Sequence, residues 1–475
     1  MLTITQGLDD LAVFGEEDMN DTRCGACGSF LFSVVREGAF VHVAMGSLAL
    51  LLRDLSPWQA MVLAGGAVAF NLYALPRLAG TLYRPGEVRR RLRSGIVLYP
   101  IAVFILIFAF PDRLDIVAAS WGALAFGDGM ATLVGRRSSG RRIPWNPEKS
   151  VAGSIAFIVF GGAAASFLCW WCRSTVIPPP YHWFSIWMPW LAVIVAASVE
   201  TIPIRLDDNV SVPASASATL WFASFVSEDL AVKTISAIGD TLPRAILVNA
   251  AVAVAGYFGG TVTVAGAMTG GVIGTVIAAT LGWGGWAVLL ATFGLAVVSS
   301  RLGLRKKSLL GIAEERGGRR GAGNAIANTG VAATAAMLAV LTYAHEGARV
   351  AFVAALAAGG SDTVASEIGK AWGRRTILVA TLAPVPPGTS GAISAEGTAA
   401  GLIAALALAA IASVFGLVSF SAVPLIVVAA TVGSFAESVL GATLEAPGVL
   451  NNDVLNFVNT AIAALAALAL VEAFH

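Results

Sequence analysis

The sequence predicts an all-α polytopic membrane protein with about 13–15 transmembrane helices, arranged as two related, parallel modules. The 475 residues are 57% hydrophobic and only 12% charged, and the mean hydropathy is +0.79. Apolar runs recur along the whole chain, and about 20 apolar residues form a helix that crosses a bilayer. A short acidic pattern occurs twice among these runs. A water-soluble fold would need an implausibly large apolar core.

The predicted spans follow a polar N-terminal segment, residues 1–29, which lacks the basic start and apolar stretch of a signal peptide. The chain contains 51 glycines, which let membrane helices approach one another closely. The spans are expected near residues 38–53, 58–78, 95–110, 115–135, 151–171, 187–204, 213–227, 243–259, 261–281, 285–300, 324–344, 349–369, 391–414, 416–443 and 453–474.

Basic residues are concentrated in four loops, 82–93, 136–149, 301–320 and 370–375. The positive-inside rule places such loops in the cytoplasm. An even number of predicted spans separates each loop from the next, so all four share one side with the N-terminus. We therefore expect a multi-pass protein of the cytoplasmic membrane. The net charge of only +1 gives no general case for nucleic-acid binding.

The four cysteines form two closely spaced pairs, Cys24 with Cys27 and Cys169 with Cys172. Two such pairs can indicate a zinc site. The predicted topology places the pairs on opposite sides of the membrane, which argues against one shared metal site. We therefore expect incidental thiols.

An acidic pattern begins at Asp128 and again at Asp362. Each Asp is followed by Ala three residues on, a hydroxyl residue four on and Gly seven on. The Asp, the hydroxyl residue and the Gly share one helix face. Ionisable residues within membrane-spanning segments are costly and by default indicate a functional site; the alternative is an acid satisfied by a neighbouring side chain. Because transporters also contain repeats, the duplication alone does not indicate an enzyme.

The two halves continue in the same order after the acidic pattern. A later span carries Glu200 in the first half and Glu437 in the second. A polar cluster follows each, Asp207-Asp208-Asn209 and Asn451-Asn452-Asp453. We therefore divide the chain into the cytoplasmic segment 1–29, a first membrane module 30–228, a linker 229–242 and a second membrane module 243–475.

The polar residues of the first module include carboxylates that can hold a metal ion and a basic helix start that can hold phosphate. Together these two kinds of group indicate a phosphorylated substrate. The carboxylates at or near the cytoplasmic ends of its spans belong to Asp128, Glu200, Asp207 and Asp208. Such carboxylates hold Mg²⁺ against phosphates. The start of the next span, with Lys149, Ser150 and Gly153, is suited to anions, and Arg136 can clamp phosphate. The plainer alternatives are a capping turn at Asp207–Asn209 and topology signals for the basic residues.

The second module offers a different set of polar residues. Asn324 and Asn328 lie one turn apart on one helix face, and Asp362 and Glu367 follow. Gly388-Thr389-Ser390 is either a turn that wraps phosphate with backbone N–H groups or an ordinary loop. Glu437, Asn452 and Asn456 lie near the end of the chain. The phosphate-binding motif of P-loop NTPases is absent from the sequence.

The first module, roughly residues 30–228, resembles the phytol kinase family, which is related to dolichol kinases and phosphatidate cytidylyltransferases. The resemblance is carried by Arg93-Ser94-Gly95, Tyr99-Pro100, Gly127-Asp128-Gly129, Gly135-Arg136, Asn146 to Ser154, Val199 to Pro203, Asp207-Asp208-Asn209 and Val212-Pro213.

The second module, roughly residues 243–474, resembles the phytyl-phosphate kinase family. The residues that carry this resemblance are Lys306-Lys307, Asn324 to Asn328, Ser361 to Gly369, Val385 to Gly391 and Gly433 to Ala442. One position departs from the pattern, because members of that family usually have Asp where this chain has Glu437.

The resemblance implies phosphorylation of a long-chain isoprenoid alcohol to its monophosphate and then its diphosphate, with CTP or another nucleoside triphosphate as donor and with Mg²⁺. Together with the residue patterns it predicts the following sites. Catalytic roles are expected for Asp128, Lys149, Glu200, Asp208, Asp362 and Glu367. Metal ligation is expected for Asp128, Asp207, Asp208, Asp362 and Glu437. Substrate or nucleotide contacts are expected for Arg136, Ser150, Gly153, Asn209, Asn324, Asn328, Gly388, Thr389, Ser390, Asn452 and Asn456.

Two alternatives remain open. Cytidylyl transfer to a lipid phosphate needs similar metal and phosphate groups, and release of pyrophosphate rather than CDP would distinguish it. A transporter with parallel repeats would carry its acids near the bilayer midplane, whereas here they are expected at cytoplasmic ends beside basic loops.

Overall fold

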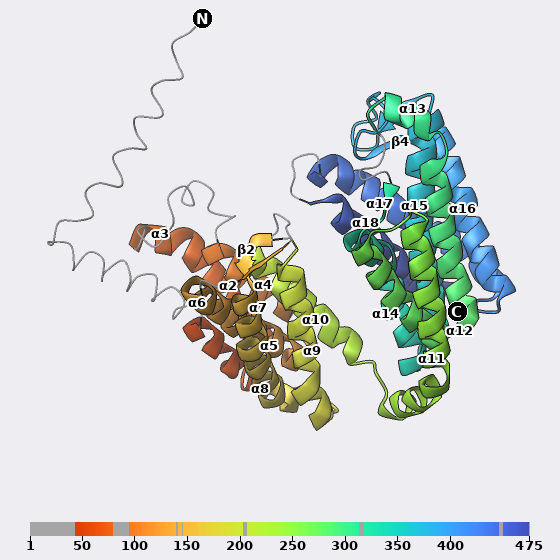
Figure 1. Cartoon of the computed structure of the whole chain (residues 1–475). Coiled ribbons are helices and arrows are strands. Elements are labelled where there is room, and N and C mark those ends of the chain that lie inside the picture. Colours follow the sequence, from red (N-terminus) through yellow and green to blue (C-terminus); the bar gives the residue numbers. More distant parts are fainter. Residues whose placement is uncertain are drawn as a thin grey trace, which may run out of the picture. The chain divides into compact units, whose positions relative to one another are not determined.

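The computed structural model describes residues 43–78, 95–138, 141–144, 146–202, 207–312, 318–445 and 450–474. The predictions for segment 1–29, for Cys24 and Cys27 and for loop 82–93 lie outside these residues. The chain divides into two compact units with their boundary between Ser224 and Phe225. Helices make up nearly all of the regular structure (Figure 1), and the strands of the described residues form only two short hairpins. The predicted all-α class is confirmed.

Ten helices of the described residues are long and apolar enough to cross a membrane, so the chain is an integral, multi-pass membrane protein. They are Pro57–Leu78, Leu114–Arg137, Val151–Thr175, His182–Glu200, Glu228–Phe258, Val264–Arg301, Ala322–Leu341, Ala395–Val414, Phe420–Glu445 and Asn452–Phe474. One of these, Val264–Arg301, is two helices joined at Gly282, whose φ of 67° breaks the helical path and separates the two predicted spans. Two further apolar helices, Val43–Arg53 and Gly95–Ala109, are shorter.

The first unit is built from short helical segments, several joined end to end. Its elements are η2 Leu48–Arg53, α2 Pro57–Ala69, η3 Phe70–Ala74, α3 Leu75–Leu78, α4 Gly95–Ala109, α5 Leu114–Gly122, η6 Ala123–Asp128, α6 Gly129–Arg137, β1 Arg142–Ile143, β2 Asn146–Ser150, α7 Val151–Ala156, η7 Phe157–Gly161, α8 Gly162–Cys172, η8 Arg173–Thr175, α9 His182–Glu200 and α10 Asp208–Ala223.

The second unit contains longer helices. Its elements are α11 Glu228–Phe258, α12 Val264–Arg301, α13 Leu304–Leu309, α14 Ala322–Leu341, α15 His345–Trp372, β3 Thr376–Leu378, β4 Ala392–Ser394, α16 Ala395–Val414, η10 Phe420–Ala422, α17 Val423–Leu440, η11 Gly441–Glu445 and α18 Asn452–Phe474.

Each unit has one helix at its centre, and that helix leads to the acidic pattern. In the first unit every residue from Leu114 to Ala125 is buried. In the second, every residue from Val350 to Ser361 is buried, and α15 packs against α12, α14, α16, α17 and α18 (Figure 1). A helix that is apolar on all sides is stable only when it is surrounded. The long Ala-rich runs before Asp128 and Asp362 are therefore core, not lipid-facing surface.

The outer helices expose large apolar side chains, as the bilayer requires. Helix α2 begins with a capping box, in which Ser56 and Gln59 bond reciprocally, and it exposes Trp58 by 70% and Leu63 by 57%. Such a surface would aggregate in water but is matched by lipid.

In the interior of the first unit, Cys169 and Cys172 are buried free thiols.

Residues 229–242, which we expected to link the modules, are helical and form the first part of α11. Their composition explains this, because Glu228 and Asp229 lie in the first turn, where negative charge stabilises a helix N-terminus. The helix then continues through Pro243 into the next apolar run.

Candidate functional site

Asp128 lies where an irregular stretch of helix ends. It is the last residue of η6, a π-helical segment that follows the buried helix α5. Its neighbour Gly127 is in close contact with a second π-helical segment, η7: a Cβ built on Gly161 would lie 3.1 Å from the Gly127 Cα. Single π-helical turns often occur at functional sites. The two glycines thus bring η6 against η7 and fix the place where Asp128 leaves the core.

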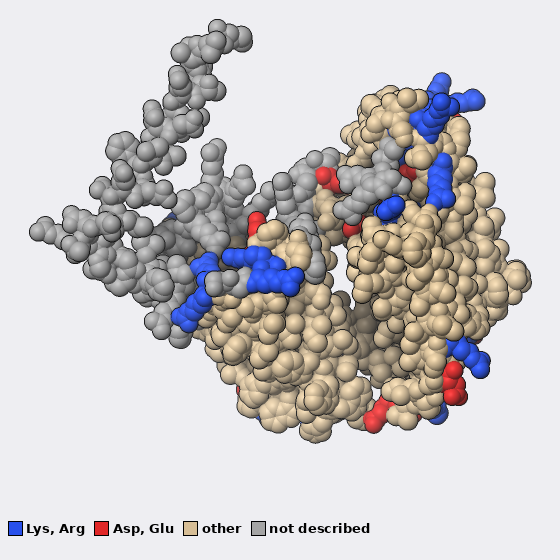
Figure 2. Space-filling view, viewed as in Figure 1, with Lys and Arg blue, Asp and Glu red and all other residues tan. Residues whose placement is uncertain are grey.

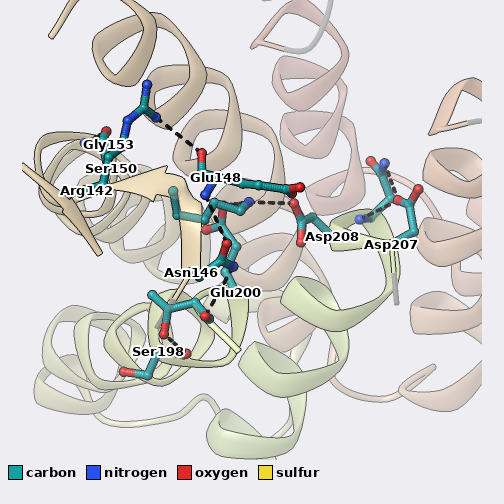
Figure 3. Close-up of polar contacts among 12 residues, drawn as sticks. Arg142, Asn146, Glu148, Ser150, Gly153, Ser198, Glu200, Asp207 and Asp208 are labelled. Carbon is teal, nitrogen blue, oxygen red and sulfur yellow. Dashed lines mark hydrogen bonds and ion pairs between the residues drawn. The ribbon is translucent and has the colours of Figure 1, made fainter. Parts of the chain in front are cut away.

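Lys149 connects three elements of the first unit. Its Nζ donates to Glu200 Oε1 at 2.5 Å and to Asp208 Oδ2 at 2.7 Å. Lys149 comes from β2, Glu200 is the last residue of α9 and Asp208 is the first of α10. The close-up in Figure 3 shows both acids beside β2. The exposed fractions of the three side chains are 28%, 7% and 36%, so the cluster is open to its surroundings on the Asp208 side.

Three carboxylates meet at this point. One carboxylate oxygen each from Asp128, Glu200 and Asp208 lies within 4.8 Å of the other two. Oxygen donors of this kind suit Mg²⁺, whose ligands lie about 2.1 Å away and are therefore at most about 4.2 Å apart. The donor set fits such an ion after a small inward movement.

Asp207 was predicted to belong to the metal ligands, and the structure instead groups Glu200 with Asp128 and Asp208. Asp207 caps α10: its Oδ1 accepts from the Asn209 backbone N–H at 2.9 Å and from Asn209 Nδ2 at 2.7 Å. This is the capping turn that the sequence left as an alternative for Asp207–Asn209.

The two acids change the protonation behaviour of Lys149. Partial burial lowers the pKa of this lysine, but the negative charges of Glu200 and Asp208 outweigh burial, and the net result is a raised pKa. Lys149 is therefore positively charged over the whole physiological range. Charge-assisted bonds of this kind are stronger than neutral ones, and they hold the ammonium beside the acids.

The β-hairpin holds Lys149 in place. Asn146 Nδ2 donates to the Thr201 carbonyl at 3.3 Å, and Asn146 Oδ1 accepts from the Glu148 N–H at 3.2 Å. The first bond fastens the start of β2 to the residue that follows Glu200, and the second fixes the Asn146 side chain within the strand. Lys149 lies three residues after Asn146 on the same strand. The anchored strand therefore places the Lys149 side chain beside Glu200 and Asp208.

Ser150 and Gly153 form the N-terminus of α7. The Gly153 N–H donates to Ser150 Oγ at 3.1 Å, so the serine is the N-cap of the helix. Arg136 is exposed in the last turn of α6. Several lysines and arginines of this unit gather at the hairpin end (Figure 2), so phosphate would meet positive charge there.

The same local geometry recurs in the second unit. The Gly397 N–H donates to Ser394 Oγ at 3.2 Å, so Ser394 caps α16 as Ser150 caps α7. In the two hairpins Ser150 pairs with Arg142, and Ser394 with Thr376. Ser394 is thus the structural counterpart of Ser150, and it was not among the predicted site residues.

The helices that carry the acidic pattern pack on these caps in the same way. A Cβ on Gly153 would lie 3.1 Å from the Ala131 carbonyl oxygen, and one on Gly397 would lie 2.5 Å from the Ala365 carbonyl oxygen. Ala131 and Ala365 both stand three residues after the aspartate. The alanines of the pattern therefore lie where the two helices pack closely.

The acids of the second unit are differently arranged. Asp362 and Glu437 are joined by a side-chain hydrogen bond, so the two carboxyl groups share one proton. Ser390 donates to Glu445, which ends the π-helical segment η11. Thr389 is bonded to the Pro386 carbonyl at 2.8 Å, and Gly388 has a φ of 87°. Glu445 was not predicted.

Glu367 belongs to a buried ion cluster rather than to this acid pair. Lys307 is fully buried; it donates to Glu367 and, at 2.8 Å, to the Ser300 carbonyl. Lys370 donates to the other Glu367 oxygen at 2.9 Å. Removing one partner of such a cluster leaves an uncompensated buried charge. Lys307 was not predicted as a site residue, although its position directly after an apolar span was a usable signal.

The predicted asparagines of the second unit lie on two helices. Asn324 accepts from Arg320 Nη1 at 3.0 Å, and Asn328 Nδ2 donates to the Asn324 carbonyl at 3.0 Å. On α18, Asn452 is exposed at the first position and Asn456 is buried one turn later. Arg320 was absent from the predicted site.

Comparison with known proteins gives similarities of different extent. The model of the family described as integral membrane protein DUF92 matches residues 247–464. An uncharacterized membrane protein of Synechocystis is 42% identical over 203 residues, which cover 42% of this chain and 78% of that protein. The chloroplastic protein VTE6 of Arabidopsis thaliana is 32% identical over 252 residues, covering 50% of this chain and 74% of that protein.

Chloroplastic phytol kinase 1 of Arabidopsis thaliana is 31% identical over 138 residues. The match covers 29% of this chain and 45% of that protein, so the chain spans less than half of the phytol kinase. No solved structure matches the chain significantly.

Proposed function

The chain belongs to the DUF92 family of integral membrane proteins, and from this premise we propose that it is a membrane kinase for isoprenoid substrates. In this proposal the first unit phosphorylates a long-chain isoprenoid alcohol, with CTP or another nucleoside triphosphate as donor and with Mg²⁺. The second unit adds a phosphate to the resulting monophosphate. The similarity to phytol kinase 1 supports an isoprenoid alcohol as the first substrate.

The observation that carries the proposal is the junction of Lys149 with three carboxylates at the hairpin end of the first unit. Phosphoryl transfer requires mainly positioning and charge stabilisation, and this junction contains a cation and hard oxygen ligands. Asp128, Glu200 and Asp208 would hold Mg²⁺, which would neutralise charge on the donor phosphates. Lys149 would turn from the acids to a phosphate oxygen of the bound nucleotide.

Phosphoryl transfer in this proposal needs only the two substrates and a carboxylate that accepts the hydroxyl proton. The substrate hydroxyl oxygen bonds to the γ-phosphorus while the bond from that phosphorus to the β-phosphate oxygen breaks, and the nucleoside diphosphate leaves. The hydroxyl proton passes to a carboxylate, for which we propose Asp128, because it lies at the exit of the buried helix where a lipid hydroxyl would arrive. No covalent enzyme intermediate is required.

The second phosphorylation is assigned to the unit that contains Asp362 and Glu437. The hydrogen bond between these carboxyl groups supports a site where one cation can replace one proton. Ser390 and the turn at Gly388–Thr389 lie on the loop before β4, and Ser390 reaches Glu445 near the end of η11. The donor nucleotide would present its phosphates to this group of residues.

Both sites are proposed to open to the cytoplasm. Arg136 and Arg137 lie in the last turn of α6 and Lys306 and Lys307 in the last turn of α13, which the positive-inside rule favours on that side. Cysteines introduced at Ser138 and Gly318, in a background without native cysteine, should be modified only by reagents that reach the cytoplasmic face. Labelling from the opposite face would contradict the proposed sidedness.

The direct test is product analysis. Purified protein with CTP or ATP and a panel of isoprenoid alcohols should yield monophosphates and diphosphates, identified by mass, together with CDP or ADP. Release of pyrophosphate and formation of a cytidine-diphosphate lipid would instead show cytidylyl transfer. If Asp128→Asn and Asp362→Asn both retain full activity, the assignment of the two sites is wrong.

A further inference from the structure

A cavity of about 140 Å³ lies inside the second unit, bordered by α11, α12, α14 and α15. Its walls are mostly apolar and include Val252, Ile273, Leu289 and Phe293. Trp286 and Ala296 both border it and stand ten residues apart on α12, which corresponds to about 15 Å along a helix. The cavity is therefore long relative to its volume, as a linear hydrocarbon requires.

One end of the cavity is polar and carries a positive charge. Arg320 donates to Asn324 Oδ1 at 3.0 Å and to Ser300 Oγ at 3.2 Å, and Arg320, Asn324 and Asn328 all border the cavity. Asn328 is 9% exposed, and its Oδ1 has no hydrogen-bond partner within the described part of the chain. A buried acceptor without a partner is costly, and a water or the P–OH group of a singly protonated phosphate would satisfy it.

The polar end is next to the proposed second site. Gly359 and Thr363 of α15 border the cavity, and Thr363 directly follows Asp362 along that helix. A molecule with its chain in the cavity would therefore hold its head group within the turn of α15 that carries Asp362.

We propose that this cavity binds the first isoprene units of an isoprenyl monophosphate, with the phosphate at Arg320 and Asn324. Arginine is the side chain best suited to phosphate oxygens, and the apolar walls fit a hydrocarbon chain. The inference rests on the proposed function for its choice of ligand. A membrane phospholipid also combines a phosphate with hydrocarbon chains, and the competition experiment below distinguishes the two ligands.

The chain offers a matched pair of glycines for the test. Gly270 borders the cavity, and a Cβ built there meets nothing within 4 Å. Gly294, on the second half of the same element α12, is equally open for a Cβ but is not among the residues that border the cavity. Gly270→Leu should fill the cavity without a clash, whereas Gly294→Leu makes the same change elsewhere on α12.

The experiment uses the full chain in detergent with a farnesyl monophosphate that carries a photoreactive diazirine on its terminal isoprene. Cross-linked peptides are identified by mass spectrometry. Wild type and Gly294→Leu should be labelled on α11 and α12, and Gly270→Leu should lose about tenfold or more of that labelling, the equivalent of about 1.4 kcal/mol in binding. Unlabelled farnesyl monophosphate should compete, and phosphatidic acid should not.

Equal labelling of the two leucine variants, or labelling only outside α11, α12, α14 and α15, would overturn the proposal. Competition by phosphatidic acid as strong as that by farnesyl monophosphate would assign the cavity to a phospholipid instead. The readout is binding and needs no turnover. A wild-type protein that binds the probe in the cavity but forms no diphosphate would contradict the proposed function and leave this inference standing.

Discussion

Ser150 and Ser394 occupy the same position in the two units. Each is the last residue of a hairpin strand and the N-cap of the next helix, and each accepts a hydrogen bond from the backbone N–H of a glycine three residues later. Each cap also supports a helix that carries an aspartate near the end of a buried apolar run. The two units thus share a local framework, although their polar residues differ.

The capping role predicts how substitutions of these serines behave. Ser394→Ala should lower the free energy of unfolding by about 1 kcal/mol, whereas Ser394→Gly should cost only a few tenths, because glycine is itself tolerated at an N-cap. Unfolding in a series of denaturing detergent mixtures measures both. Equal loss in the two variants would show that the hydroxyl has some role other than capping.

The close helix contact at Gly397 predicts a larger effect. A Cβ at this position would meet the backbone oxygen of Ala365 at 2.5 Å, and backbone cannot move aside as a side chain can. Gly397→Ala should therefore destabilise the protein by about 1–3 kcal/mol. The control is Gly66→Ala on α2, where a Cβ meets nothing within 4 Å, and this change should be neutral or slightly stabilising. The same unfolding measurement compares the two variants.

The two aspartates should separate the two activities. We expect Asp128→Asn to reduce phosphorylation of the alcohol by about 10²–10³ and to leave phosphorylation of a supplied monophosphate unchanged. Asp362→Asn should have the reverse effect. Separate assays with the alcohol and with its monophosphate measure this. Loss of both activities in either folded variant would argue against independent sites.

Lys149 should be required for the first activity only. Lys149→Met removes a cation from the phosphate site and should cut the alcohol kinase rate by about 10²–10³, while Lys149→Arg should retain part of it. The control is Lys233→Met on α11, because that side chain is 76% exposed. A rate within about threefold of wild type in Lys149→Met would mean that the lysine serves only as a counter-ion or topology signal.

The raised pKa of Lys149 predicts that its contribution to folding stability does not change between pH 7 and pH 9. A group whose pKa is higher in the folded than in the unfolded protein stabilises the fold fully at pH values below its unfolded pKa, and the stabilisation is lost only as pH rises toward the folded pKa. For Lys149 this loss begins above about pH 10. The difference in thermal stability between wild type and Lys149→Arg should therefore stay constant from pH 7 to pH 9. A wild type that weakens relative to the arginine variant in this range would contradict the raised pKa.

The all-α membrane class could be predicted because it depends on local features. The length of an apolar run and the offsets within one helix are visible in the chain itself. The bond from Lys149 to Glu200 joins residues 51 positions apart. Nothing in the local pattern indicates that Glu200, rather than Asp207, joins Asp128 and Asp208.

The match between Ser150 and Ser394 was missed for a different reason. In the first unit only residues 144 and 145 separate β1 from β2, whereas residues 379–391 separate β3 from β4. Surface loops accept such insertions at low cost. Because of this insertion, residue spacing does not align Ser150 with Ser394, and the pairing of Ser394 with Thr376 in the hairpin identifies it.

Because the two central helices are buried, they respond to bilayer thickness differently from the outer helices. A bilayer thinner or thicker than a helix is accommodated by tilting, at a modest energy per ångström. The residues from Val350 to Ser361 have no lipid-facing side and are clamped by five neighbours, so they cannot follow such a change. Outer helices such as α2, with its exposed Trp58 and Leu63, would take up the mismatch. The depth of Asp362 would then stay constant when the lipid composition of the cell changes with temperature or growth.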